Sequence, residues 1–212
     1  MGIEGGERLF RRKFLLCRVL YSKRPGILTR TDVFWRSEKM KKCVFFDRDG
    51  IVNKIPDEIY VKRWEDFQLF PEFVEVLRMV RGMGYEAVIV TNQGVVARGV
   101  ISMEAVDALH ENLATVLSTT YGSDLLDILC CPHVEGECEC RKPRPGMLIE
   151  AAARHDIDLK SSWMVGDQER DIEAGRRAGC RTILVTPGEL ETKADFRVGD
   201  MKNLKSLMAD VL

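Results

Sequence analysis

Short apolar runs alternate with longer amphipathic segments from residue 44 to the end of the chain. Each run is continuously apolar, which is typical of strands buried on both faces of a parallel sheet. In the longer segments apolar residues recur at helical spacing, with proline, serine or glycine near several of their ends. We therefore expect an α/β fold with a doubly wound parallel sheet. The expected strands cover residues 44–46, 87–90, 125–129, 163–167 and 181–185, and the expected helices cover 71–82, 102–117, 145–155, 172–178 and 204–212.

Polar side chains follow four of these expected strands: Asp47 and Asp49, then Thr91 and Asn92, then a segment leading to Lys142, and finally Asp167. Because parallel strands place their carboxyl ends on one edge of the sheet, we expect these groups to converge. Two carboxylates spaced two residues apart repel each other unless a cation neutralises them or one is protonated. The pattern therefore favours Mg²⁺ and phosphate oxygens, although an Asp-x-Asp-Gly turn alone also occurs in ordinary loops.

The composition is that of an ordinary globular protein, 45% hydrophobic and 31% charged. A formal net charge of −1 gives no reason to expect a nucleic-acid partner, and no apolar run has the length of a membrane span. Residues 1–39 differ, because they are rich in Arg and Lys and lack periodicity. We expect a basic, poorly ordered arm over 1–39 and one domain over 40–212. Three interpretations of the arm are possible: a targeting segment, a tether for an anionic partner, or sequence that precedes a natural start at Met40. We favour the natural start at Met40.

Four of the seven cysteines lie between residues 130 and 140. Clustering of this kind favours a metal site in a reducing compartment over disulfides, so we expect a cytoplasmic protein. Cys131, His133, Cys138 and Cys140 form the pattern C-x-H-x₄-C-x-C, which supplies the four ligands of a structural zinc site. Zinc would fix a loop that has little core of its own, and a metal-free loop is the alternative. Cys130 is expected to be buried rather than a ligand.

Two other polar residues lie in expected helices, and a third directly precedes one. His110 is expected to be a surface or half-buried histidine and not a ligand, and His155 to act at a helix terminus rather than in catalysis. Asp171 follows Asp167 by one helical turn, and either supports a metal through water or caps the helix.

The residues Asp47-Arg48-Asp49-Gly50, Thr91, Lys142 and Gly166-Asp167 resemble the four motifs of the haloacid dehalogenase (HAD) superfamily of phosphohydrolases, over about residues 40–190. The resemblance implies that Asp47 is a nucleophile that forms an aspartyl-phosphate. Asp49 would be the general acid that afterwards activates water. Thr91 and Lys142 would bind the phosphoryl oxygens, and Mg²⁺ would be held by Asp47, Asp167 and the main-chain carbonyl of Asp49.

The cysteine cluster and the segment that follows it narrow the resemblance. Together with Thr91-Asn92-Gln93 and Ala97-Arg98-Gly99, they are similar to the D-glycero-D-manno-heptose 1,7-bisphosphate phosphatases and to the histidinol-phosphatases, which lack a large cap domain. This implies a phosphatase for a small phosphorylated metabolite, with removal of a heptose 7-phosphate as the leading activity and histidinol phosphate as the alternative substrate. We expect the protein to be a monomer. The implied substrate contacts are Asp57, Glu58, Ile59, Tyr60, Asn92, Gln93, Gly94, Arg98, Arg141 and Gln168.

The sequence departs from the heptose-enzyme pattern at three points. Ile51 replaces a threonine, which affects local packing, and the zinc loop is short, as in histidinol-phosphatases. Gln168 replaces a lysine that contacts substrate. Against these, Arg98-Gly99 and the Pro-Gly-Met that follows in the segment after Lys142 favour the heptose side. Arg141 is also well suited to grip a second phosphate through its planar guanidinium. A catalytically silent, partner-binding domain is a rival of a different class, but it has no physical need for the intact acidic pair, Lys142 and Asp167.

Overall fold

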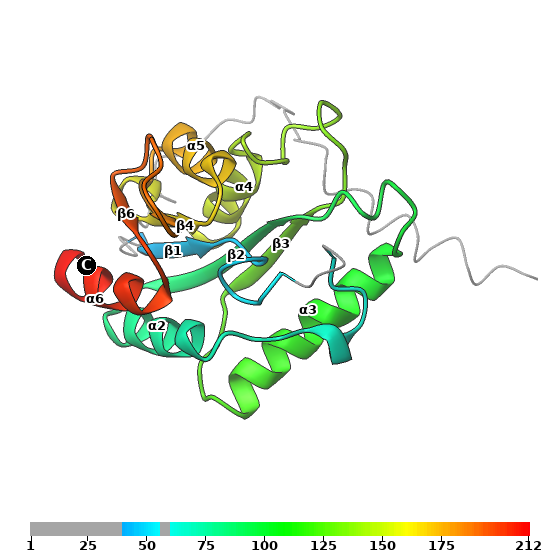
Figure 1. Cartoon of the computed structure of the whole chain (residues 1–212), viewed down its shortest axis with the longest axis horizontal. Coiled ribbons are helices and arrows are strands. Elements are labelled where there is room, and N and C mark those ends of the chain that lie inside the picture. The colour runs from blue at the N-terminus through cyan, green and yellow to red at the C-terminus, as the bar shows by residue number, and fades with distance from the viewer. Residues whose placement is uncertain (1–39, 56–59) are drawn as a thin grey trace, which may run out of the picture. The chain divides into compact units, whose positions relative to one another are not determined.

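The computed structural model describes residues 40–55 and 60–212, so the basic arm 1–39 and the expected contacts Asp57, Glu58 and Ile59 lie outside the described residues. Six strands form one parallel sheet in the order β3-β2-β1-β4-β5-β6 (Figure 1). This confirms the doubly wound α/β fold. The strands are β1 (Cys43–Phe46), β2 (Glu86–Asn92), β3 (Asp127–Cys131), β4 (Trp163–Gly166), β5 (Arg181–Val185) and β6 (Phe196–Val198).

Helices cover both faces of the sheet, with α2, α3 and α6 on one face and α4 and α5 on the other (Figure 1). Their bounds are α2 (Pro71–Gly82), α3 (Met103–Thr119), α4 (Gly146–His155), α5 (Glu169–Ala178) and α6 (Met201–Val211), with the short 3₁₀ helices η2 (Trp64–Asp66) and η3 (Leu159–Ser161). None of the helices in the described ranges has the length and hydrophobicity that a bilayer crossing requires.

Strand β1 lies in the middle of the sheet and explains the apolar run that precedes Asp47. Val44 and Phe46 pack into the core under α2, α3 and α6, whereas Cys43 and Phe45 pack into the core under α4 and α5. All four side chains are fully buried. A strand covered on both faces needs apolar residues at every position, so its sequence is continuously apolar.

Several element boundaries differ from the sequence-based expectation. Helix α6 begins at Met201 because the Asp200 carboxylate accepts a hydrogen bond from the Asn203 N–H at 2.8 Å and caps the helix. Strand β3 begins at Asp127 and extends to Cys131. Strand β6 was not expected, because its three residues are partly exposed and carry no clear pattern.

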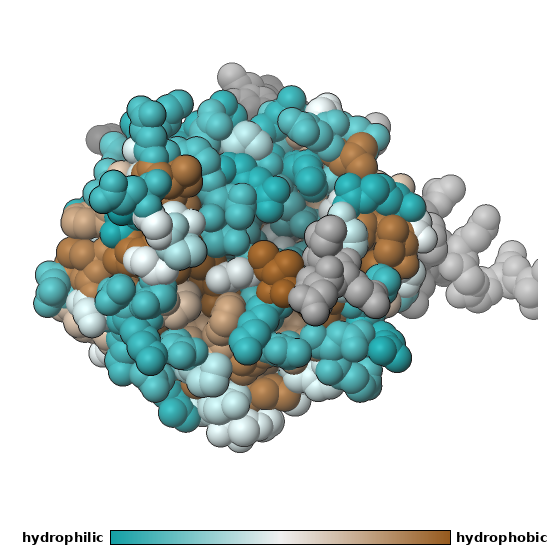
Figure 2. Space-filling model, viewed as in Figure 1, coloured by the Kyte–Doolittle hydropathy of each residue, from teal (hydrophilic) through white to brown (hydrophobic). Residues whose placement is uncertain are grey.

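Exposed apolar residues are scattered over the part of the surface that the structure describes. The face in Figure 2 is largely hydrophilic, and its apolar areas are separated from one another. Large exposed apolar residues in the described ranges come from different elements: Met40, Ile55, Met83, Val100, Ile149 and Leu190. Single exposed apolar residues of this kind are normal for folded proteins.

Candidate active site

The carboxyl ends of β1, β2 and β4 meet at one edge of the sheet. Phe46 pairs with Ile89 on one side and with Val165 on the other. The Asp47 N–H extends this ladder by donating to the Val165 carbonyl at 2.9 Å. This register brings the acidic groups after β1 and β4 together, as the sheet topology predicts.

Lys142 is the centre of the site's charge arrangement. Its ammonium group lies 2.8 Å from Asp47 Oδ1, 2.8 Å from Asp171 Oδ1 and 2.8 Å from the Val90 carbonyl oxygen, with only 2% of the residue exposed. Asn92 fixes the Lys142 backbone, since its amide side chain accepts from the Lys142 N–H at 3.0 Å and donates to the Lys142 carbonyl at 2.9 Å. Burial alone would lower the pKa of Lys142, but the Asp171 and Asp47 carboxylates raise it above its usual value.

The three carboxylates around this lysine are suited to a cation. Asp47, Asp167 and Asp171 each offer an oxygen, and these atoms lie within 4.8 Å of one another. Burial and the charge of Asp171 raise the pKa of Asp47 to about 7. Burial and the charge of Asp47 raise the pKa of Asp167 to about 6. Carboxyl groups with raised pKa values indicate a site that needs more positive charge, and a hard divalent cation supplies it.

Gly50 makes room for this cluster. Its φ is +89°, and a Cβ at this position would lie 2.3 Å from Asp167 Oδ2. Glycine is therefore required both by the backbone conformation and by the close approach of the carboxylate. Asp171 caps α5, one of its two expected roles, by accepting from the Gln168 N–H at 3.1 Å in a capping box. Its contact with Lys142 was not expected from the sequence.

Asp49 is held by a dense set of donors. Arg48 Nη2 donates to both carboxylate oxygens of Asp49, at 3.0 and 2.9 Å. Asn53 Nδ2 donates to Oδ1 at 3.0 Å and Gln93 Nε2 donates to Oδ2 at 2.9 Å, while Gln93 also contacts the Thr91 hydroxyl at 2.9 Å. Burial would raise the pKa of Asp49, but the Arg48 charge and these hydrogen bonds lower it below its ordinary value.

Arg48 and His110 belong to this network and were missed in the sequence. Arg48 is 1% exposed, and its Nη1 lies 3.2 Å from His110 Nε2. The expectation of a surface or half-buried His110 is wrong, because the residue is only 8% exposed and is one of the buried residues of α3. Its spacing of one helical turn from Val106 and from Leu113, both buried, is the signal that could have shown this.

Apart from Gln168, the expected substrate contacts that the structure describes lie on the side of β2 and β3. Arg141 Nη1 donates to the His133 carbonyl at 2.9 Å, and a Cβ on Gly94 would lie 3.2 Å from the same nitrogen. Arg98 Nη2 donates to the Tyr60 hydroxyl at 2.9 Å and stacks over its ring, with the guanidinium carbon 5.3 Å from the ring centroid. Two guanidinium groups therefore stand on this side of the acidic cluster.

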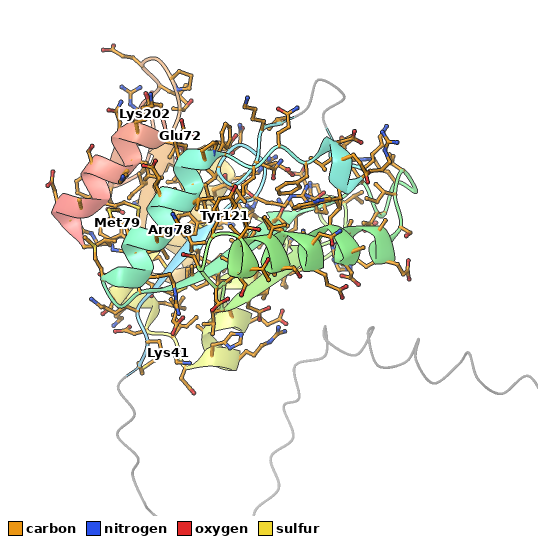
Figure 3. All side chains as sticks on the ribbon, turned by 90° about the horizontal axis from the view of Figure 1, so that it is seen from below. Lys41, Glu72, Arg78, Met79, Tyr121 and Lys202 are labelled. Atoms are coloured by element: carbon orange, nitrogen blue, oxygen red, sulfur yellow. The ribbon has the colours of Figure 1, made fainter. Side chains whose placement is uncertain are left out.

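A cavity of about 520 Å³ opens on the opposite side, beside β4 and β5. Its lining includes Gly50, Asp167 and Gln168 from the side of the acidic cluster. It also includes Glu72 and Lys202, from the first turns of α2 and α6, which lie near each other in Figure 3. Gln168, expected to contact substrate, donates to Asp167 Oδ2 at 3.3 Å.

The Cys/His cluster forms a compact set of donor atoms. Sγ of Cys131 lies 3.6 Å from His133 Nδ1 and 3.5 Å from Cys138 Sγ. Cys140 Sγ lies 3.5 Å from the same nitrogen and 3.2 Å from Cys138 Sγ. Ligands of a tetrahedral zinc with bonds of ~2.3 Å would stand about 3.8 Å apart, so this cluster needs little adjustment to hold one ion. A hydrogen bond from Cys140, with others from His133, lowers the pKa of Cys131 to about 5, and the same contact raises the pKa of Cys140. Only the Cys131 thiolate is therefore favoured in the metal-free cluster.

The cluster is joined closely to the rest of the site. A Cβ on Gly146, the first residue of α4, would lie 2.3 Å from the Glu139 carbonyl oxygen, so the loop packs directly on the helix start. Cys130 lies outside the donor set. Its side chain is only partly buried, where the sequence predicted a buried one, and desolvation raises the pKa of its thiol to about 12.

Comparison with known proteins identifies the same family that the motifs suggest. The HAD-hydrolase-like family model matches residues 139–202. A D-glycero-alpha-D-manno-heptose-1,7-bisphosphate 7-phosphatase from Photorhabdus laumondii is 40% identical over 156 residues, which cover 69% of this chain and 84% of that protein. A D-glycero-beta-D-manno-heptose-1,7-bisphosphate 7-phosphatase from Helicobacter pylori (strain J99) is 36% identical over 169 residues, 79% of this chain and 95% of that protein.

Solved structures agree with these sequence matches. The D,D-heptose 1,7-bisphosphate phosphatase from B. bronchiseptica, complexed with magnesium and phosphate, superposes with a TM-score of 0.72 at 29% identity, covering 81% of this chain and 99% of that one. A putative HAD-like phosphatase from Mesorhizobium loti gives a TM-score of 0.70 at 31% identity, over 81% and 86% of the two chains. The chain belongs to the HAD-like phosphatase family that contains the D-glycero-D-manno-heptose 1,7-bisphosphate 7-phosphatases.

Proposed function

We propose that this protein is a Mg²⁺-dependent phosphatase that removes the 7-phosphate of D-glycero-D-manno-heptose 1,7-bisphosphate. One observation carries the proposal: the buried Asp47 carboxylate lies 2.8 Å from the Lys142 ammonium and beside two further carboxylates that suit a cation. An anionic nucleophile can approach a phosphate dianion only where positive charge is concentrated in this way. The heptose-phosphatase relatives support the choice of substrate.

The first chemical step uses Asp47 and Asp49. An Asp47 oxygen attacks phosphorus, the bond from phosphorus to the sugar oxygen breaks, and Asp49 gives its proton to that oxygen. Asp49 has a lowered pKa in the free protein. A phosphate dianion beside it restores the protonated form, because like charges disfavour ionisation. The Thr91 hydroxyl and the Lys142 ammonium hold the phosphoryl oxygens and balance their charge as it redistributes.

The second step releases the product. Asp49, now a carboxylate, takes a proton from water, and the water oxygen attacks phosphorus. The bond from phosphorus to Asp47 breaks, inorganic phosphate leaves, and both carboxyl groups return to their starting states. A positioned acid–base group of this kind contributes ~10²–10⁴-fold to the rate.

Two metal ions complete the proposal. Asp47, Asp167 and the main-chain carbonyl of Asp49 would hold Mg²⁺, which supplies positive charge at the phosphoryl group. Cys131, His133, Cys138 and Cys140 would hold Zn²⁺ as a closed structural site. The cradle at Gly50 and the spacing of the four sulfur and nitrogen donors support these two assignments.

Charge on the two sides of the site supports a bisphosphate whose second phosphate lies toward β2 and β3. Arg141 and Arg98 stand on that side. The cavity on the other side is lined by more carboxylates than cations: Glu72, Asp167 and Asp200 against Lys202. A second phosphate would be attracted to the arginines and repelled from the cavity.

Histidinol phosphate is the second candidate, favoured by this same acidic cavity. The ammonium group of histidinol phosphate would complement the carboxylates that line the cavity. Gln168, which also lines the cavity, carries no charge that would oppose the ammonium. The two candidates therefore place the leaving group on opposite sides of Asp47.

Phosphate release with Mg²⁺ tests these assignments. Both anomers of the heptose bisphosphate are compared with histidinol phosphate and p-nitrophenyl phosphate. A preference of several orders of magnitude in kcat/KM for one heptose anomer is expected, and Arg141→Met should raise KM for that substrate but not for p-nitrophenyl phosphate. A preference for histidinol phosphate would reverse the substrate assignment. Full activity in Asp47→Asn would refute the mechanism.

We also propose that residues 40–212 form the catalytic domain, that 1–39 are dispensable for the chemistry, and that the enzyme is a cytoplasmic monomer without nucleic-acid or membrane partners. Unpaired thiols at all six described cysteines support a reducing compartment. A chain that begins at Met40 should keep the kcat/KM of the full chain, and loss of activity would contradict the domain assignment.

A further inference from the structure

His110 and Arg48 form a chain of contacts that ends at Asp49. The Arg48 guanidinium makes contacts at both ends: Nε and Nη2 donate to the Asp49 carboxylate at 2.9–3.2 Å, and Nη1 lies 3.2 Å from His110 Nε2. His110 comes from α3, and it lies 62 residues from Arg48 in the sequence. Both side chains are buried, so few other conformations are available to them.

The chemistry of the contact fixes the state of the imidazole. A guanidinium group has donors and no acceptor, so Nε2 must present a lone pair and the proton must be on Nδ1. Burial and the adjacent Arg48 charge lower the pKa of His110 to about 3, although the Asp49 carboxylate opposes this. His110 is therefore a neutral acceptor, and its removal would take one hydrogen-bond acceptor away from the buried Arg48 guanidinium.

We propose that His110 is a positioning residue for the phosphatase reaction: its Nε2 holds the Arg48 guanidinium, which orients the Asp49 carboxyl group for proton transfer. The inference rests on the proposed function, in which Asp49 protonates the leaving oxygen. Asn53 and Gln93 hold Asp49 from other directions, but each makes one hydrogen bond to it, whereas Arg48 contacts both oxygens. His110 touches neither substrate nor Asp49, and acts through Arg48.

The choice of leaving group separates positioning of the acid from a general structural effect. A sugar alkoxide needs a proton as it leaves, whereas p-nitrophenolate is stable without one. The ratio of kcat/KM for the sugar phosphate to kcat/KM for p-nitrophenyl phosphate therefore reports on Asp49. Because kcat/KM covers steps up to the first irreversible one, it excludes the later hydrolysis of the aspartyl-phosphate.

The experiment compares His110→Leu, which has no acceptor, with His110→Gln, whose amide oxygen can replace Nε2. His110→Leu is expected to lower kcat/KM at least tenfold for the sugar phosphate and less than threefold for p-nitrophenyl phosphate. His110→Gln should recover most of the loss. His155→Leu is the control at an unrelated histidine, which contacts Asp127 and should leave both rates unchanged.

A second variant decides the matter if His110→Leu does not fold. Arg48→Lys keeps the charge but loses the planar fork, and it should show the same selective loss. Parallel loss with both substrates, or no loss at all, would overturn the proposal. Asp47→Asn provides the separate test of the proposed function, because it must abolish both activities whatever the role of His110.

Discussion

Replacing Lys142 by methionine removes the ammonium that contacts two buried carboxylates. Lys142 Nζ lies 2.8 Å from Asp47 and 2.8 Å from Asp171, and both acids are buried. Methionine fills a similar space without the charge. The acids would then repel each other across a site that lacks a compensating cation, and the pKa of Asp47, already raised to about 7 in the folded protein, would rise further.

The expected cost follows from this geometry. Removing one partner of a buried ion pair destabilises a protein by ~3–5 kcal/mol, because an uncompensated charge stays buried. At acidic pH the carboxyl groups are protonated in both the folded and the unfolded states, so the cost is small. As pH rises above the pKa that the carboxyl groups have in the unfolded state, the unfolded protein releases its protons while the folded protein retains them. The cost therefore increases with pH until the pH exceeds the raised pKa of the folded state. Activity should also fall by ~10²–10³-fold or more, as it does when one charge-stabilising donor is lost.

Urea unfolding without Mg²⁺ at about pH 5 and pH 8 measures this cost directly. Lys160→Met at an exposed position of η3 is the matched control, and it should change the unfolding free energy by less than about 0.5 kcal/mol. Adding Asp171→Asn to Lys142→Met should recover part of the loss by removing one carboxylate. A cost below about 1 kcal/mol at pH 8, or the same cost at both pH values, would refute the argument.

Three further results are expected. Cys138→Ser should lose the single zinc ion that elemental analysis is expected to find in the wild type and lower the unfolding free energy by several kcal/mol, and a wild type without zinc would contradict the site. Gly50→Ala should reduce kcat/KM more than about 100-fold, because its Cβ would lie 2.3 Å from the Asp167 carboxylate, whereas Gly82→Ala has open space and should be neutral. The pKa values of Asp47 and Asp167 are raised to about 7 and about 6, so protonation of these groups stabilises the metal-free fold. This stabilisation is lost as pH rises through the raised pKa values. Mg²⁺ should therefore raise Tm more at pH 8 than at pH 5, and an equal shift would count against a site at these carboxylates.

Elements that depend on local information could be predicted from the sequence. The continuous run of β1 indicates burial on both faces, and Ser102 marks the start of α3, where its hydroxyl accepts from the Ala105 N–H at 3.2 Å. The start of α6 could also have been found, since Asp200 is a good capping residue and Met201 and Leu204 begin the apolar spacing. Strand β6 could not, because it is held by pairing with β5 rather than by any pattern of its own.

The site follows the same division. Asp47, Lys142 and Asp167 follow strands and match motifs, so the topology of a parallel sheet predicts that they meet. The contact of Arg48 with His110 depends on how α3 lies across the sheet, which the spacing of apolar residues does not specify. A buried histidine on an apolar helix face is a sign that some partner exists, but the partner comes from 62 residues away.

Arg48 has two opposing effects on Asp49, and their balance bears on the proposal that Asp49 serves first as an acid and then as a base. The guanidinium orients the carboxyl group through both of its oxygens, but its charge lowers the pKa of Asp49 and leaves the free protein with a carboxylate. In the proposed reaction, an arriving phosphate dianion would supply the opposite charge and draw a proton to Asp49 only when substrate is present. Once the leaving group had departed, the same guanidinium would favour the carboxylate that activates water. The contact would therefore assist the base of the proposed second step at some expense to the acid of the first, which is consistent with one residue serving both.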